Sequence, residues 1–473
     1  MRDIYGLVIN GREVLDGPTF ALHFPWDGSQ VTRVVLADRH QVTQAVDAAE
    51  AAGEVARHLP LWRRAEILDA VAGELAQRRE ELALLVTHEV GKPIKDSRAE
   101  VDRSVSTLHF AADATRALHD TTIPLDAMKG GEGRLGAVIR EPVGIIAAIT
   151  GFNFPLLLAC HKVGPAIGGG NTVVLKPTPQ TSASSIELAR LFVAAGLPEG
   201  ILNVVTGGRE QGEQLVSDSR VRLITFTGST AVGKHIAASA GYKRVLLELG
   251  SNAANIVDAD ANLTLAADRC VAGGFSAVGQ SCISVQRIYA HQSIYAQFTA
   301  RLVDRVRRLR VGDPRDEGVD VASVISVEAA QRIAEWIRAA EADGAQVLVG
   351  GGRQGSVVDP TVIAEIRSPM RVVRDEVFGP VIGVAPFSSF REAVALVNDS
   401  RYGLQAGVFT NNLGHAMEAI QEIRSGSVLI NEASSFRADH MPYGGVKDSG
   451  WGKEGPAAAL AEMTERKVVM VRL

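Results

Sequence analysis

The sequence contains few cysteines. Only Cys160, Cys270 and Cys282 occur among 473 residues, and such a small odd number excludes a framework of disulfide bonds. No two of them form a Cys-x-x-Cys pair of the kind that binds zinc, so we expect no metal centre. Cys160 and Cys270 lie in apolar, helix-like runs, where we expect small buried hydrophobic residues.

The sequence also lacks a basic tract, a membrane-spanning run and a signal-peptide core. Its formal net charge is −5, which argues against nucleic acid as the main partner. No apolar run reaches the roughly 18 residues that a spanning helix needs, and residues 1–5 do not resemble a secretory signal. We therefore expect a cytoplasmic protein without a membrane partner. The length is sufficient for two or three domains.

The first part of the chain divides into a β-rich and a helical segment. Residues 1–36 are predicted to form short strands, with Asn10-Gly11 in a hairpin turn. Residues 41–118 carry apolar residues at helical spacing, interrupted at Pro93. Residues 120–140 form two strand-like runs around a turn. Because an isolated hairpin is marginally stable, we expect it to pair with another strand or another subunit.

Two series of apolar strands and helices follow. The first covers residues 143–258 and the second covers residues 262–432. This alternation predicts an α/β fold with doubly wound parallel sheets. The tail, residues 466–473, has the pattern of a last strand without an obvious partner.

Two familiar phosphate-binding patterns are misleading here. Residues 131–136 match Gly-x-Gly-x-x-Gly, but a strand-like run follows them, so we interpret them as a turn. Residues 228–234 match a P-loop, but His235 replaces the hydroxyl residue that would hold magnesium. A P-loop phosphotransferase is therefore disfavoured. The helix that begins near Ser229 still offers free N–H groups to a dinucleotide phosphate.

One cysteine has surroundings suited to catalysis. Cys282 follows Gly279-Gln280-Ser281, whose small residues would leave the sulfur accessible on a loop. Glu248 lies in the apolar run 246–250, where burial would raise the pKa of its carboxyl group towards that of a general base. A nucleophile and a buried base form a catalytic pair if the fold brings them together.

Further candidates adjoin predicted strands. Asn153 precedes an apolar helix, where its amide could donate to an oxyanion or simply cap the helix. Lys176 ends a buried strand at the edge where such sheets bind ligands; a surface lysine is the alternative. Glu376 and Phe378 adjoin a Gly-Pro turn. They could hold a ribose and pack against a nicotinamide ring, although an exposed turn glutamate is commoner.

Together these motifs resemble those of the aldehyde dehydrogenase superfamily over nearly the whole chain. In sequence order they are Asn153 in Phe-Asn-Phe-Pro, Lys176 in Leu-Lys-Pro, Phe226–Ser229, Glu248–Gly250, Gly279–Cys282 and Glu376–Pro380. Two departures are Thr150-Gly151, where a Pro-Trp-like pair is usual, and Ser251, where a second glycine is usual.

The resemblance implies an aldehyde dehydrogenase-like fold with two doubly wound α/β domains and a small β oligomerisation domain. Residues 1–119 and 141–250 would bind the dinucleotide, and residues 251–440 would form the catalytic domain. Residues 120–140 and 456–473 would bridge subunits of a homodimer or homotetramer.

The resemblance also implies a mechanism. The Cys282 thiolate attacks an aldehyde carbonyl, and the Asn153 amide and the Cys282 backbone N–H hold the oxyanion. Transfer of a hydride to the nicotinamide leaves a thioester, which water activated by Glu248 hydrolyses. Relatives that acylate coenzyme A tend to lack this glutamate, so its presence favours a free acid as the product.

The same resemblance implies the cofactor contacts. Lys176, Glu376, Phe378 and the segment Thr227-Gly228-Ser229 would contact a dinucleotide. In members that prefer NAD, a glutamate stands three residues after the lysine, where this chain has Pro179. A carboxylate there would repel a 2′-phosphate. Its absence permits NADP, and we expect NADP or NAD as the cofactor.

Two arginines bear on the substrate. Arg103 and Arg437 resemble phosphate-gripping arginines of non-phosphorylating glyceraldehyde-3-phosphate dehydrogenases, although Ser281 replaces a third arginine. Residues 439–445 resemble lactaldehyde and sulfolactaldehyde dehydrogenases. We therefore expect a small polar aldehyde, anionic or hydroxylated. The alternatives are ordinary surface or bridging arginines in a dehydrogenase of neutral aldehydes, and a catalytically idle binding protein.

Overall fold

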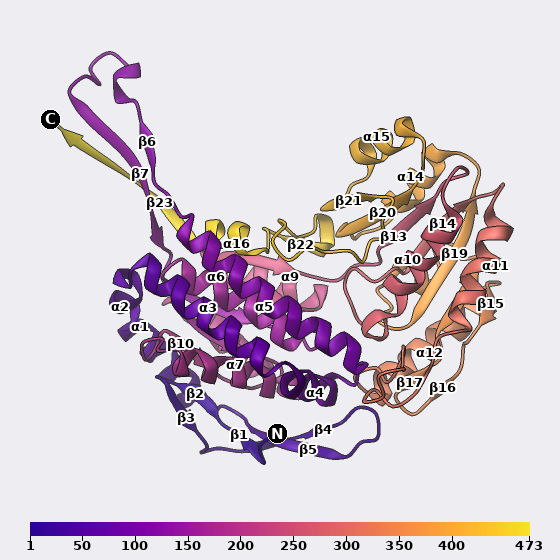
Figure 1. The fold of residues 1–473 in the computed structure, drawn as a ribbon, viewed down its shortest axis with the longest axis horizontal. Coiled ribbons are helices and arrows are strands. Elements are labelled where there is room, and N and C mark those ends of the chain that lie inside the picture. Colours follow the sequence, from indigo (N-terminus) through magenta and orange to yellow (C-terminus); the bar gives the residue numbers. More distant parts are fainter.

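The computed structural model describes residues 1–473, which form two α/β lobes and a projecting arm (Figure 1). The first lobe contains an eight-stranded sheet of order β22-β12-β11-β8-β9-β10-β2-β3. Its five central strands are parallel, and its edge strands are antiparallel. The bounds are β2 Leu7–Ile9, β3 Arg12–Val14, β8 Ile145–Ile149, β9 Thr172–Lys176, β10 Leu202–Val204, β11 Val221–Thr227, β12 Arg244–Glu248 and β22 Gly450–Trp451.

Helices cover both faces of this sheet because alternate strand residues enter two separate cores. Ile146 and Ala148 of β8 pack with helices α3 to α7, whereas Ile145 and Ala147 pack with α1, α8 and α9. This arrangement confirms the predicted doubly wound sheet. The helices of this lobe are α1 Arg39–Ala51, α2 Gly53–His58, α3 Leu61–Gln77, α4 Arg79–Val90, α5 Ile94–Arg116, α6 Pro155–Gly168, α7 Ala183–Ala194, α8 Arg209–Ser217, α9 Thr230–Ser239 and α16 Pro456–Glu462.

The second lobe contains a seven-stranded sheet of order β15-β18-β19-β14-β13-β20-β21, in which only β15 is antiparallel. One core of 49 buried residues packs between this sheet and its helices. The strands are β13 Ala254–Val257, β14 Arg287–His291, β15 Gln346–Val349, β18 Thr361–Ala364, β19 Val381–Phe387, β20 Gln405–Phe409 and β21 Ser427–Ile430. The helices are α10 Leu263–Phe275, α11 Tyr295–Val306, α12 Val327–Ala342, α13 Arg371–Arg374, α14 Phe390–Asn398 and α15 Leu413–Glu422.

Smaller elements complete the two lobes. Asn10 and Gly11 join β2 to β3 with φ angles of 50° and 72°, which confirms the predicted hairpin turn. No helix is long and apolar enough to span a bilayer. The short strands and 3₁₀ turns are β1 Ile4–Tyr5, β4 Thr19–His23, β5 Gln30–Val35, β16 Arg353–Gln354, β17 Val357–Val358, η1 Leu125–Ala127, η2 Pro179–Thr181, η3 Ser276–Gly279 and η4 Lys447–Ser449.

The projecting arm is a three-stranded antiparallel sheet of order β23-β7-β6. Its strands are β6 Thr121–Ile123, β7 Arg134–Pro142 and β23 Thr464–Arg472. Since β23 pairs with β7 along nine residues, the hairpin does pair with another strand, as predicted. That strand is the tail, for which the sequence showed no obvious partner. Helix α16, which the resemblance grouped with the bridging segment, packs on α5 and α6 and also contacts β23.

Candidate active site

Four predicted site residues lie at one edge of the first sheet. β9 ends at Lys176, β11 at Thr227 and β12 at Glu248, while Asn153 follows β8. Because these strands are parallel neighbours, their carboxyl ends meet at the same edge. The sheet therefore presents an amide, a cation, a hydroxyl and a carboxylate together.

The loop that presents Cys282 has a strained backbone. Ala277 and Val278 have φ angles of 49° and 60°, a left-handed conformation that β-branched valine rarely adopts. The carboxylate of Asp96, at the start of α5, accepts hydrogen bonds from the Ala277 N–H at 2.9 Å and the Ser276 hydroxyl at 3.0 Å. A residue of the first lobe thus holds the loop of the second.

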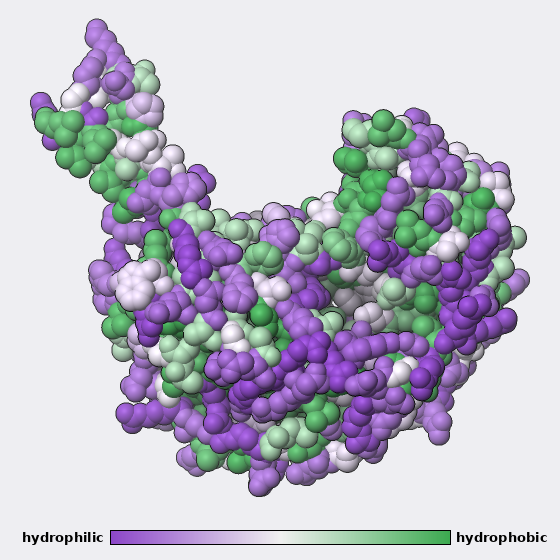
Figure 2. All heavy atoms as spheres, viewed as in Figure 1, coloured by the Kyte–Doolittle hydropathy of each residue, from purple (hydrophilic) through white to green (hydrophobic).

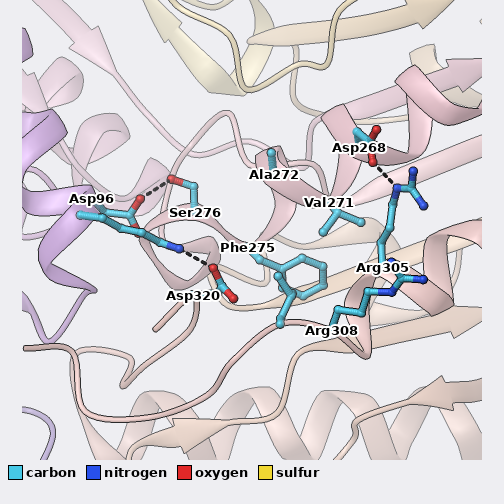
Figure 3. Close-up of a pocket in the computed structure, with 11 residues that line it drawn as sticks. Asp96, Asp268, Val271, Ala272, Phe275, Ser276, Arg305, Arg308 and Asp320 are labelled. Carbon is cyan, nitrogen blue, oxygen red and sulfur yellow. Dashed lines mark hydrogen bonds and ion pairs between the residues drawn. The ribbon is translucent and has the colours of Figure 1, made fainter. Parts of the chain in front are cut away.

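The Asp96 contact borders an open cavity of about 520 Å³ between α5, α10 and α11 (Figure 3). The charges that line it are largely paired with one another, Lys95 with Asp320 and Arg305 with Asp268. None of the predicted site residues lines it. The cavity therefore lies outside the candidate active site.

The sulfur of Cys282 shares a hydrogen bond with Tyr443. The distance between Sγ and Oη is 3.0 Å. Burial raises the pKa of the Cys282 thiol to about 12, and the Tyr443 hydrogen bond opposes this rise. Ser281 is partly exposed and its hydroxyl makes no hydrogen bond within the chain. Cys160 and Cys270 are fully buried, as predicted.

Asn153 faces the cysteine loop and does not cap α6. Its Nδ2 donates to the Gln280 carbonyl at 2.8 Å, two residues before Cys282. The first N–H groups of α6 donate instead to Glu100 Oε1, at 2.9 and 3.1 Å. Lys92 pairs with Glu100 and donates to the Asn153 carbonyl at 3.0 Å. The helix-cap interpretation of Asn153 was therefore wrong.

Glu248 is buried, as its apolar run predicted. The residue is 6% exposed, and its Oε2 atom has no hydrogen-bond partner. Burial, assisted by the negative charge of Glu454, raises the pKa of the Glu248 carboxyl well above its usual value. A methyl group at Gly444 would lie 2.7 Å from Glu248 Oε1. The glycine next to Tyr443 therefore leaves room for the Glu248 carboxylate.

The two arginines belong to one chain of contacts. Arg437 Nη2 donates to Glu454 at 2.9 Å and lies 3.1 Å from His161 Nε2, which lies 3.3 Å from Asp439. Arg103 also bonds Asp439, with its Nη2 at 2.7 Å from Oδ1. The side chain of Arg437 is 7% exposed and that of Arg103 is 31% exposed. Each arginine thus pairs with one carboxylate, while Nη1 of each makes no hydrogen bond within the chain.

A comparison of the sequence with family models identifies the protein class. The model described as "Aldehyde dehydrogenase family" matches residues 15–469. The chain belongs to the aldehyde dehydrogenase family.

Individual relatives of this aldehyde dehydrogenase are similar over their full lengths. The 3-sulfolactaldehyde dehydrogenase of Priestia aryabhattai is 42% identical over 470 residues, which are 99% of this chain and 98% of the relative. Aldehyde dehydrogenase 21 from Physcomitrella patens, solved with the reaction product succinate, has a TM-score of 0.97 at 36% identity and covers 100% and 99% of the two chains. Glyceraldehyde-3-phosphate dehydrogenase from Methanocaldococcus jannaschii, solved with NADP, has a TM-score of 0.94 at 36% identity and covers 97% and 100%.

These similarities confirm the predicted fold class and activity. The protein is an NAD(P)-dependent aldehyde dehydrogenase, and solved relatives include enzymes that use NADP and enzymes that use NAD. Aldehydes are accordingly its substrates.

The carboxyl ends of β9 and β11 in this aldehyde dehydrogenase carry polar groups without partners. Lys176 is 7% exposed, and burial alone lowers the pKa of its amine to about 8, with no carboxylate opposing it. Thr227 Oγ1 is buried without a partner. Ser229 caps α9, and the Gly228 N–H donates to a carbonyl of β12. Pro179 opens η2 beyond Lys176. An unpaired buried cation and hydroxyl fit the phosphates or ribose hydroxyls of a dinucleotide.

Glu376 and Phe378 lie where the two lobes of the aldehyde dehydrogenase meet. Glu376 Oε1 accepts a hydrogen bond from the Ser251 N–H at 2.9 Å, so Glu376 is not the free, exposed turn residue of the alternative interpretation. Desolvation raises the pKa of its carboxyl group to about 7. Phe378 has a φ of 52° and packs edge-on against Phe152 at 5.6 Å between ring centroids.

Three residues beside the aldehyde dehydrogenase site, Tyr443, His161 and Glu454, have no role that their local sequence predicts. Tyr443 belongs to the family-like segment 439–445, in which its position alone indicates no role. His161 interrupts the apolar run of α6, and a buried polar residue in such a run is the signal that could have identified it. Glu454 lies between a lysine and a glycine near the end of the chain, and no local pattern marks it.

Proposed function

We propose that this aldehyde dehydrogenase oxidises a small aldehyde with an anionic or hydroxylated tail to its carboxylic acid. The chain of contacts that joins Arg103 and Arg437 carries this proposal. The Arg437 guanidinium carbon lies 3.8 Å from the centre of the Tyr443 ring, whose hydroxyl contacts Cys282 Sγ. An anionic group on the unused guanidinium N–H groups would therefore lie a few bonds from a carbonyl held at the sulfur.

The names of the relatives support this substrate class. The relative from Priestia aryabhattai oxidises 3-sulfolactaldehyde, and the enzyme from Physcomitrella patens releases succinate. Both compounds carry a second anionic or polar group near the reacting carbon. Since an arginine fork pairs well with sulfonate and carboxylate alike, the shared chemistry is a small aldehyde with an anionic tail.

The first chemical step uses Cys282 and Asn153. The Cys282 thiolate forms a bond with the carbonyl carbon, and the π electrons of the carbonyl move to its oxygen. Asn153 Nδ2 and the Cys282 backbone N–H would donate hydrogen bonds to this oxyanion. A nicotinamide held beside Cys282 would supply the hydride acceptor, so loss of a hydride from the tetrahedral carbon would leave a thioester on Cys282.

The second step uses Glu248. Its carboxylate takes a proton from water, and the water oxygen attacks the thioester carbon. The carbon–sulfur bond then breaks, and the thiolate and the carboxylic acid are released. The raised pKa of the Glu248 carboxyl and its unpaired Oε2 atom support this role as a base. The presence of this base favours a free acid over an acyl-coenzyme A product.

The chain offers groups for the dinucleotide at the same edge of the sheet. Lys176 and Thr227 would bind its phosphates or ribose hydroxyls, and Glu376 would bind the second ribose. Phe378 would pack against the nicotinamide ring. Pro179 presents no carboxylate to a 2′-phosphate, which supports the use of NADP.

The arm supports a proposal about assembly. Figure 2 shows hydrophobic atoms gathered on the arm, which projects away from both lobes. We infer that other copies of the chain cover it in a homodimer or homotetramer, because the burial of such surface stabilises association. The exposed hydrophobic residues of the arm and its tail are Met128, Leu135, Val468, Met470, Val471 and Leu473.

A second candidate substrate class is a neutral hydroxyaldehyde. It is favoured by one observation: both arginines already pair with carboxylates, Arg103 with Asp439 and Arg437 with Glu454. Steady-state kinetics with 3-sulfolactaldehyde and lactaldehyde, which differ by the sulfonate, would separate the two classes. A higher kcat/KM for 3-sulfolactaldehyde supports the anionic tail, whereas a higher value for lactaldehyde supports the neutral class. An absence of nucleotide reduction with either aldehyde and with a wider panel would refute the proposal.

A further inference from the structure

The phenol of Tyr443 is fixed against the reactive sulfur. Tyr443 is 2% exposed and packs in a small apolar cluster with Ile283 and Leu404. Its backbone N–H and carbonyl both pair with Glu454, at 2.9 and 2.6 Å. The only hydrogen bond of its hydroxyl joins Cys282 Sγ at 3.0 Å. The backbone pairing and the packing of the ring fix the position of the side chain. The Tyr443 hydroxyl is therefore directed at a single atom, Cys282 Sγ.

The neighbouring charges do not favour a thiolate by themselves. The charged groups that face the sulfur are the carboxylates of Glu376 and Glu248 and the guanidinium of Arg437. The two carboxylates oppose negative charge on Cys282, while the guanidinium, which stacks on the Tyr443 ring, favours it. A hydrogen-bond donor on the sulfur is therefore needed to offset two like charges and burial.

The direction of the hydrogen bond follows from the acidities of the two groups. A free cysteine ionises near pH 8.5 and a free tyrosine near pH 10, so the thiol of such a pair ionises first. The phenol then keeps its proton and becomes the donor, and hydrogen bonds to ionised groups are the stronger kind.

We propose that Tyr443 is a further catalytic residue of this enzyme, whose O–H donates a hydrogen bond to the Cys282 thiolate before attack and again when the thiolate leaves. The inference rests on the proposed role of Cys282 as nucleophile. The thiol proton passes to solvent when the thiolate forms, and the phenol proton remains on Oη throughout. In the thioester the sulfur has no negative charge. The hydrogen bond therefore stabilises the thiolate before it attacks and the thiolate that is released on hydrolysis.

Removal of the hydroxyl has two opposing effects on the sulfur. Loss of one hydrogen bond to an ionised group raises the pH at which Cys282 ionises by about one to two units. A thiolate of higher pKa is also intrinsically more nucleophilic: the logarithm of its rate constant rises by about half of the rise in pKa. Below both midpoints the variant should therefore react about 3- to 10-fold more slowly, and at high pH it should react faster.

The test measures the alkylation of Cys282 by iodoacetamide as a function of pH, with the modified peptide quantified by mass spectrometry. Tyr443→Phe should raise the midpoint by about one to two units, which appears below both midpoints as a rate about 3- to 10-fold lower than that of the wild type. Tyr289→Phe is the matched control, because it removes another buried phenol hydroxyl of the same lobe, one that pairs with Arg287. It should keep the wild-type profile.

A second variant keeps the inference falsifiable if the phenylalanine protein folds poorly. Replacement of Tyr443 by 3-fluorotyrosine preserves the shape of the ring but makes the phenol a better donor, so it should lower the midpoint. A merely structural role would not shift the midpoint in opposite directions in the two proteins. An unchanged midpoint in the folded variants would overturn the inference. Turnover by Cys282→Ala would instead refute the nucleophile itself, whatever the alkylation profiles show.

Discussion

Replacement of Arg437 by alanine should selectively impair an anionic substrate. In the structure Arg437 Nη2 contacts Glu454 and His161, whereas Nε is buried without a partner and Nη1 makes no hydrogen bond. Alanine would remove these two unused donors together with the positive charge. It would also deprive Glu454 of a partner, although Lys162 remains 3.4 Å away. The first effect depends on the substrate and the second does not.

The burial of each arginine sets the expected magnitude. Arg437 is 7% exposed, and hydrogen bonds from a buried cation to an anion contribute about 2–3 kcal/mol, equivalent to about 30- to 150-fold in kcat/KM. Arg103 is 31% exposed, so solvent screens its charge, and Arg103→Ala should cost about 1 kcal/mol, or about fivefold. The larger effect should therefore come from Arg437.

The assay compares kcat/KM for 3-sulfolactaldehyde with kcat/KM for lactaldehyde in each protein. The ratio of the two values cancels any general damage caused by the loss of Arg437 from Glu454. Arg209→Ala provides a matched control, because Arg209 is 82% exposed and pairs only with Glu213. An equal fall for both substrates would show that Arg437 only supports the site, and no fall for either would show that the anionic tail is bound elsewhere.

Three other predictions concern the cofactor and the assembly. Because the pKa of Lys176 is lowered to about 8, its amine is charged below that pH and neutral above it. The affinity for NADP, measured by fluorescence titration, should therefore fall as the pH rises through about 8. Lys176→Gln should make the affinity less dependent on pH. Pro179→Glu should shift the ratio of kcat/KM values from NADP towards NAD by repelling the 2′-phosphate; an unchanged ratio would place the ribose elsewhere. Deletion of residues 467–473 exposes the edge of β7 and removes part of the apolar arm, so light scattering should show a smaller assembly; retention of the wild-type mass would contradict the proposed interface.

The alternation of strands and helices could be predicted because apolar residues recur at a different spacing in a helix and in a strand. The apolar run of β12 and the apolar helix α6 lie where the sequence placed them, and the turn at Asn10-Gly11 follows from the conformations that those two residues permit. The burial of Glu248 was predictable for the same reason: the three residues before it in the strand, Val245, Leu246 and Leu247, are apolar. These features depend on residues that are close in the sequence.

Pairings between distant residues could not be predicted from local patterns. The tail strand β23 shows its alternation, but nothing in residues 464–472 specifies β7 as the partner. Likewise, the contact of Cys282 with Tyr443 joins residues 161 positions apart. The carboxylates that pair with Arg103 and Arg437 were missed because sequence shows which residues carry charge, but not which charges the fold brings together.

The proposed thioester on Cys282 and its hydrolysis by Glu248 are tested most directly by rapid kinetics of Glu248→Gln. Glutamine preserves the size of the buried side chain but cannot accept the proton of water, so the first turnover should proceed and the second should stall. The account predicts a burst of about one reduced nicotinamide per active site, followed by slow turnover, with the acyl group found on the Cys282 peptide by mass spectrometry. Equal loss of the burst and of steady-state turnover, or an acyl group on another residue, would contradict it.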